Sequence, residues 1–248
     1  MKIQKIKNIC IILFSIVFLN INAQENKQSA FAFNYNYQIP IGTIANVYGD
    51  NSAVGASYFF ETSNNLIFGV EASYMFGINI KNPNIFNNIS TENGAIIDAN
   101  GYYANVKTMQ RGFNSHLFSG YAFHFFKNNL SGIYISQGIG YLQHQIFIDT
   151  KNQTIPQLNE EMKKGYDRFS NGLSTKFCFE YKYYHRKGKF QISSGVNYII
   201  AYTKNQRIYD FAKNEYYQNK RTLDQLLGLK IEIIIPINRK NKEEFHYY

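Results

Sequence analysis

The sequence predicts an all-β fold in which eight antiparallel strands close into an up-and-down transmembrane barrel. Three observations predict it. Eight stretches alternate apolar and polar residues with a period of two, as strands do, because successive side chains of a strand point to opposite faces. The connections between these stretches are alternately long and short. The chain also begins with the features of a secretory signal, which indicates export from the cytoplasm.

The first stretch shows the alternation most clearly. Over residues 30–39 the odd positions are aromatic or aliphatic, from Phe31 to Ile39, and the even positions are small or polar. The same pattern recurs over residues 51–60, 65–78, 112–126, 133–148, 173–184, 190–201 and 223–237. Most of these stretches reach the roughly 9–11 residues that a tilted strand needs to cross a bilayer. A mean hydropathy of -0.34 is compatible with such strands, because alternation averages apolar and polar residues.

The connections support the same topology. The short ones cover residues 61–64, 127–132 and 185–189, and the long ones cover 40–50, 79–111, 149–172 and 202–222. Outer-membrane barrels have short periplasmic turns and longer external loops, and eight strands with both termini in the periplasm need four loops and three turns. A soluble barrel or sandwich would also alternate, with its apolar face inside. We favour the membrane barrel, because the polar face carries Gly, Ser, Asn, Gln and charges that suit a polar lumen, and Tyr and Phe lie near strand ends as in interfacial girdles.

The ends of the chain fall outside the barrel. Lys2, Lys5 and Lys7 precede an apolar run over residues 9–19, and Ala23 offers a small residue for cleavage. This run is shorter than the roughly 20 residues that a membrane-spanning helix needs, so we expect residues 1–23 to be a signal peptide that is removed. Residues 24–237 then form the barrel, and residues 238–248 form a C-terminal tail. Removing the three lysines lowers the formal net charge from +9 to +6.

Several segments also carry a family resemblance. They are YQIP at 37–40, LIFGVE at 66–71, ANV at 104–106, GIGYLQH at 138–144, IPQL at 155–158 and GYDR at 165–168. With these segments the chain resembles the small eight-stranded outer-membrane β-barrel proteins of Gram-negative bacteria, and within them an uncharacterised branch. The resemblance implies a location in the bacterial outer membrane. Some small barrels of this kind are accessory subunits of machines for barrel assembly or type IX secretion, which supplies a hypothesis for function.

Charged residues at the positions of the polar, inward-pointing face of the strands predict a charged lumen. The charged set is Glu71, Lys176, Glu180, Lys182, Lys230 and Glu232. Charges inside an eight-stranded barrel have to be paired or hydrated, and an interior of this size is just wide enough to be filled by side chains. We therefore favour a salt-bridged plug over a narrow path for ions or solutes.

Two histidines share this inward parity on adjacent strands. The predicted turn at 127–132 would bring His116 and His144 nearly opposite each other. Two histidines on one wall could begin a metal site, but no third ligand is evident. Hydrogen bonding within the lumen is the favoured interpretation, and we expect no metal and no cofactor.

The long loops are the better candidates for interactions, because loops of this length usually carry function or are disordered. The candidates in the third loop are Ile155, Pro156, Leu158, Tyr166, Asp167 and Arg168. The apolar side chains could pack on the barrel rim or dock a partner, whereas Asp167 and Arg168 are expected to form a local ion pair. Residues 207–221 of the fourth loop are rich in Tyr and Lys and are either solvated or in contact with anionic lipopolysaccharide.

These features favour a structural or interaction subunit of a larger outer-membrane complex, with other outer-membrane proteins or lipoproteins and the surrounding lipid and lipopolysaccharide as partners. A narrow channel for ions or small solutes is the alternative, and a lipid-modifying enzyme ranks third. We expect no enzyme, because no motif groups a nucleophile with a base. Nucleic acid is not expected as a partner, because no basic run alternates with aromatic residues.

Overall fold

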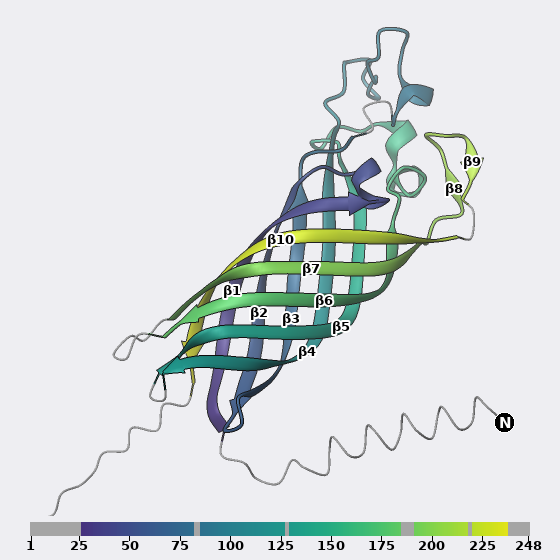
Figure 1. Ribbon diagram of the computed structural model, residues 1–248. Helices are drawn as coiled ribbons and strands as arrows, with labels where there is room; N and C mark the ends of the chain where they lie inside the picture. Colours follow the sequence, from purple (N-terminus) through teal and green to yellow (C-terminus); the bar gives the residue numbers. More distant parts are fainter. Residues whose placement is uncertain (1–25, 82–84, 127–128, 185–190, 218–219, 238–248) are drawn as a thin grey trace, which may run out of the picture.

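The main element of the structure is a closed ring of eight antiparallel strands (Figure 1). The computed structural model describes residues 26–81, 85–126, 129–184, 191–217 and 220–237. The strands are β1 (Asn26–Gly42), β2 (Asn51–Thr62), β3 (Leu66–Gly77), β4 (Lys107–Phe126), β5 (Asn129–Asp149), β6 (Ser170–Tyr183), β7 (Gln191–Asn205) and β10 (Arg221–Pro236). Each of these strands pairs with the next one along the chain. The last strand, β10, also pairs with the first, β1, and this closes the ring. The predicted all-β, eight-stranded antiparallel up-and-down barrel is confirmed.

Several strands extend beyond the predicted stretches at the loop end of the barrel. β4 begins at Lys107 rather than at residue 112, and β7 continues to Asn205 rather than to residue 201. Pairing persists there, with Lys107 opposite Asp149 and Ser170 opposite Asn205. Backbone hydrogen bonds hold these strand ends together after the apolar alternation has stopped, so periodicity alone underestimates the strand lengths.

The outer face of the barrel is apolar around the whole ring. All eight strands contribute large apolar side chains that are exposed, including Phe33 on β1 (56% exposed), Ile139 on β5 (66%) and Leu229 on β10 (58%). Exposed apolar surface on this scale marks a membrane or protein contact. A soluble barrel would direct these residues into its core.

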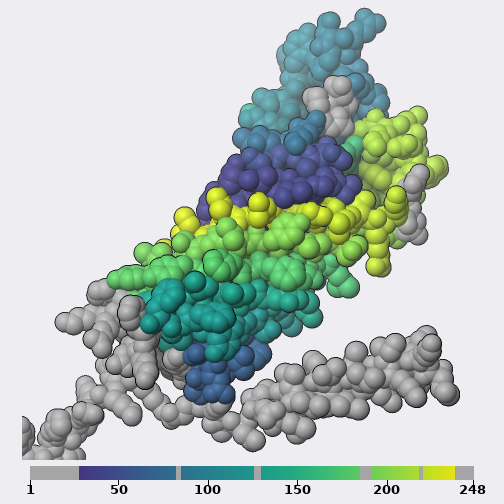
Figure 2. Space-filling view, in the orientation of Figure 1, coloured from purple at the N-terminus to yellow at the C-terminus, as the bar shows by residue number. Residues whose placement is uncertain are grey.

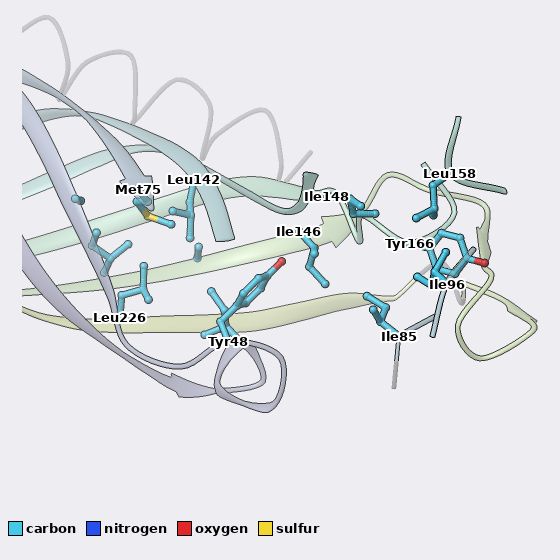
Figure 3. Close-up of a cluster of buried hydrophobic side chains, with 14 of the residues drawn as sticks. Tyr48, Met75, Ile85, Ile96, Leu142, Ile146, Ile148, Leu158, Tyr166 and Leu226 are labelled. Atoms are coloured by element: carbon cyan, nitrogen blue, oxygen red, sulfur yellow. The ribbon is translucent and has the colours of Figure 1, made fainter. Parts of the chain in front are cut away.

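The interior consists of a polar layer between two apolar clusters. At the turn end, a cluster forms around Phe59, Ile67 and Tyr134. At the loop end, a larger cluster runs from Met75 and Leu142 inside the barrel to loop residues such as Tyr166 (Figure 3). Figure 2 shows the loops as a bulky extension at this end of the barrel. The loops therefore share one apolar core with the upper part of the barrel.

Short elements shape the loops. They are η1 (Ile44–Asn46), η2 (Asn87–Ile89), η3 (Pro156–Leu158), α2 (Glu160–Lys163) and the hairpin of β8 (Tyr209–Asp210) with β9 (Glu215–Tyr216). In the described part of the chain, no helix is long and apolar enough to cross a membrane. The predicted signal peptide (1–23) and C-terminal tail (238–248) lie outside the described residues and stay predictions.

Candidate functional site

The predicted lumen charges lie on three strands of the barrel, β3, β6 and β10, and meet in one buried network. Lys230 on β10 is central: its Nζ lies 2.7 Å from Glu180 Oε1, 2.9 Å from Glu232 Oε1 and 3.3 Å from Glu71 Oε2. Lys176 on β6 donates to Glu71 on β3. The remaining lysine, Lys182, lies 3.7 Å from Glu180 and 3.9 Å from Glu232. The structure thus brings all six residues together, and three glutamates balance three lysines.

Little space remains in this layer. The cavity bounded by the charged residues has a volume of about 20 Å³, which is room for about one water molecule. Aromatic rings close it toward the turn end, where the ammonium group of Lys182 lies 4.0 Å from the ring centre of Phe59 and 4.7 Å from that of Tyr134. The charges therefore fill the lumen and do not line an open path.

The two lumen histidines are not opposite each other, contrary to the expectation from sequence. His116 pairs with Gly140, and His144 pairs with Gly112, so the two rings are offset by four residues, or about 13 Å along the strands. The expectation was wrong because pairing continues to Phe126 and Asn129, which moves the centre of the turn toward β4. No group of three or more potential metal ligands occurs among the described residues.

Each histidine instead has its own partners. His116 Nε2 lies 2.9 Å from Ser174 Oγ on β6. His144 Nε2 lies 3.0 Å from Asp224 Oδ2 on β10, and its Nδ1 lies 3.4 Å from the hydroxyl of Tyr48 in the first loop. His144 therefore connects the barrel wall with that loop at the loop end of the barrel.

The apolar candidates of the third loop are buried. Ile155, Leu158 and Tyr166 pack in the loop-end cluster with Ile85 and Ile96 of the second loop (Figure 3). They are therefore unavailable for docking a partner, and their assignment as interaction residues was wrong. Pro156 is exposed at the start of η3 and does not belong to this core.

The predicted ion pair between Asp167 and Arg168 does not form. Asp167 accepts hydrogen bonds from Arg207, with 2.8 Å between Nε and Oδ1, whereas Arg168 Nη2 lies 3.5 Å from Oδ2 of Asp210. Arg168 has a positive φ of 48°, a left-handed conformation that turns the chain between the two side chains. Both ion pairs therefore connect the third loop with the fourth, and the hydrogen bonds that Arg207 donates to Asp167 raise the pKa of Arg207.

Close packing joins these loops further. The Tyr166 hydroxyl donates to Asn88 Oδ1 of the second loop at 3.0 Å, and burial raises the pKa of this hydroxyl. The Tyr166 ring meets Phe211 of the fourth loop edge-on at 5.4 Å between centres. Gly165 permits this contact, because a Cβ there would lie 2.1 Å from the Phe211 ring. The second, third and fourth loops form one packed assembly.

Two acidic residues of the interior were missed from the sequence. Asp224 has the same inward parity as Lys230 and Glu232, but it lies near the predicted strand start, where the apolar alternation is weak. Glu61 was assigned to a turn, although β2 continues to Thr62 and directs Glu61 inward, 2.6 Å from His124 Nε2 and 3.0 Å from the Tyr134 hydroxyl. A longer predicted strand would have identified Glu61, and the alternation applied from the first residues of the 223–237 stretch would have identified Asp224. By contrast, no pattern in the sequence indicated the loop residues Arg207 and Asp210.

No protein-family model matches the chain, and no curated protein matches it either. Several solved structures are similar, and they are small outer-membrane proteins. OprG from Pseudomonas aeruginosa has 10% sequence identity and a TM-score of 0.42, with coverage of 87% of this chain and 99% of that one. Ail from Yersinia pestis has 8% identity and a TM-score of 0.39, with coverage of 84% and 98%. E. coli outer membrane protein W has 12% identity and a TM-score of 0.33, with coverage of 83% and 97%.

Proposed function

We propose that this protein is an integral outer-membrane barrel whose sealed lumen makes it a rigid anchor, and whose folded external loops bind other components of an outer-membrane complex. The single observation that carries this proposal is the combination of a filled lumen with loops that share its core. A barrel that conducts needs an open lumen, and a barrel that presents a binding surface needs loops of defined structure.

The apolar exterior supports the membrane location. Side chains such as Phe33, Ile139 and Leu229 are more than half exposed on the outer face, whereas the six charges of the network are buried inside. This inverted distribution is stable in lipid, where hydrocarbon replaces water outside the barrel and every backbone group is paired within the ring. The loop end is the external side if the barrel follows the usual arrangement of short periplasmic turns.

The narrow-channel alternative is motivated by the lumen charges. Planar bilayers containing the purified protein test it: we expect no steady current. A variant with Glu71, Lys176 and Lys230 all replaced by serine keeps Glu180, Glu232 and Lys182 of the network while removing bulk from the charged layer, and we expect it to stay closed as well, because the apolar clusters at both ends remain. Far-UV circular dichroism checks that this variant keeps its strands. Steady current through the unmodified protein would contradict the sealed-anchor proposal.

The binding role is tested by co-purification. A tag inserted between Asn93 and Gly94 avoids the packed core, because both residues are exposed in the second loop. Gentle solubilisation should recover a stoichiometric set of outer-membrane proteins or lipoproteins.

Tyr102 and Tyr103 are 71% and 74% exposed in the same loop, and aromatic residues are enriched among the side chains that dominate interfaces. Replacing both with serine should reduce recovery of the partners, whereas recovery of a lone barrel from the unmodified strain would contradict a subunit role.

The proposed role is non-catalytic. At the loop end His144 and Asp224 lie 3.0 Å apart, which is the spacing of a base and the carboxylate that orients it. Replacing His144 with glutamine should leave the composition of the outer-membrane lipids unchanged. A change in acylation would instead favour a lipid-modifying enzyme.

A further inference from the structure

A second feature of the loop end is a polar pocket beside the apolar core. It lies between the first loop, the third loop and the β8–β9 hairpin, and its volume is about 330 Å³, at the lower end of the range for small-molecule sites. Its charged and hydrogen-bonding lining includes Tyr48, His144, Arg168, Lys213, Tyr217 and Lys220. The same lining includes two carboxylates, those of Asp210 and Asp224.

Both carboxylates already have partners within the protein. Asp224 Oδ2 accepts a hydrogen bond from the Thr203 hydroxyl and lies 3.0 Å from His144 Nε2. Asp210 accepts hydrogen bonds from the backbone N–H of Ala212 at 2.9 Å and from the Tyr217 hydroxyl at 2.9 Å. Oδ2 of Asp224 and both carboxylate oxygens of Asp210 therefore already accept hydrogen bonds within the protein.

Arg168 has donors to spare. Its side chain is only 14% exposed, yet neither Nε nor Nη2 makes a hydrogen bond with any described residue. The 3.5 Å ion pair between Nη2 and Asp210 is too long to satisfy that nitrogen. Buried donors without acceptors are uncommon in folded proteins. Nε and Nη2 form one edge of the guanidinium group, the edge that binds a carboxylate or phosphate through two parallel hydrogen bonds.

The surrounding groups favour the same type of ligand. Lys213 and Lys220 are exposed at the pocket, and Lys213 pairs with the exposed Glu215 at 3.5 Å. With Arg168 they place three cations against two carboxylates in the lining. Burial raises the pKa of both Tyr48 and Tyr217, so these phenols stay neutral and do not repel an anion.

We propose that this pocket binds the carboxylate or phosphate group of an anionic ligand, with Arg168 donating both hydrogen bonds and Lys213 and Lys220 contributing positive charge. Either a small solute or a lipopolysaccharide headgroup could supply such a group. The site is separate from the exposed Tyr102 and Tyr103 and does not depend on a partner protein. Loss of co-purifying partners would therefore leave it unaffected.

The test is isothermal titration calorimetry on the full-length protein in neutral lipid nanodiscs, with inorganic phosphate and acetate as probes at constant ionic strength. We expect saturable binding of at least one probe. Arg168→Gln should weaken it at least tenfold, because it removes both the charge and the paired donors. Arg168→Lys keeps the charge but loses the second donor, and should weaken binding to an intermediate degree. Lys151→Gln, an equal change of charge at an exposed loop position, should have no effect.

Two results would overturn the inference: the absence of binding by both probes, and equal affinity in the unmodified protein and in Arg168→Gln. Circular dichroism distinguishes loss of the site from loss of fold, and Asp210 keeps its Ala212 and Tyr217 partners in either Arg168 variant. Nanodiscs that contain lipopolysaccharide identify the source of the ligand. Weaker apparent binding of phosphate to the unmodified protein there would indicate that a headgroup competes for the site; unchanged binding would indicate a soluble anion.

Discussion

Lys230 shows how a single side chain can make a charged lumen stable. Its ammonium group contacts Glu71 on β3, Glu180 on β6 and Glu232 on β10. Taking charges out of water is costly, and attraction between them offsets that cost only when each charge has good partners. Lys230 is therefore the residue whose loss leaves the largest imbalance, because three buried carboxylates would then face two lysines.

We predict that Lys230→Met destabilises the barrel by about 3–5 kcal/mol, the range for removing one partner of a buried ion pair. The methionine side chain is only one atom shorter than that of lysine, so the effect reports mainly the loss of the charge. Urea unfolding in lipid vesicles, followed by circular dichroism, measures the free energy of unfolding.

A second variant separates charge balance from packing. Adding Glu180→Gln to Lys230→Met restores equal numbers of acids and bases, and should recover part of the lost stability. Lys151→Met, which removes an exposed loop lysine, should change stability by less than about 0.5 kcal/mol. Equal stability of the two single-lysine variants would show that the lumen network contributes little.

For individual residues, the odd or even position in a strand predicted which side chains point into the barrel, but no such pattern predicted the contacts of loop residues. Glu71 and Lys230 could be assigned to the lumen because a strand alternates its faces regardless of its neighbours. The positions of His116 and His144 along the barrel axis could not be predicted, because a shift of the turn centre by a residue or two changes which residues of the two strands lie opposite each other. Arg168 and Asp167 are adjacent in sequence, but their partners lie some forty residues away.

At the scale of elements, strands and loops differ in what determines them. Each strand follows from its own alternation and from the closure of the ring. The third loop has its conformation because Tyr166 and Asp167 contact the second and fourth loops. Such contacts between separate loops leave no periodic signal, so only the lengths of the loops and their alternation with turns could be predicted.

We predict that Asp167→Asn loosens the contact between the third and fourth loops without unfolding the barrel. The ion pair with Arg207 is partly buried, with Asp167 13% and Arg207 27% exposed, so its loss should cost about 1–2 kcal/mol of local stability. Local opening exposes backbone to proteases, and trypsin should cleave after Arg207 roughly 5–30 times faster.

The matched control is Glu161→Gln. It removes an equal charge in the same loop, but from an exposed pair with Lys164, where ion pairs contribute little. Cleavage in this control should match the unmodified protein. If Asp167→Asn is cleaved no faster than the control, the loops are held by the apolar cluster alone.

At the scale of the whole molecule, the distribution of polarity is the reverse of that in a water-soluble barrel. Charged residues occupy the middle of the interior, and large apolar residues cover the outside. Two apolar clusters then close the interior on both sides of the charges. The barrel is thus sealed by its own side chains, and its outer surface requires hydrocarbon around it.

This distribution of polarity predicts whether a charge placed on the outer face raises or lowers the free energy of unfolding. Leu229 lies near the middle of β10, points outward and is 58% exposed. In water, replacing such an exposed leucine with lysine would be neutral or favourable. In a bilayer it places a charge on the lipid face, which costs about 2–4 kcal/mol near the midplane. We therefore expect Leu229→Lys to lower the free energy of unfolding in lipid vesicles by that amount. Ile208→Lys, at a loop position that is 78% exposed, should have no such effect, and a neutral Leu229→Lys would mean that this face of the barrel is not in contact with lipid.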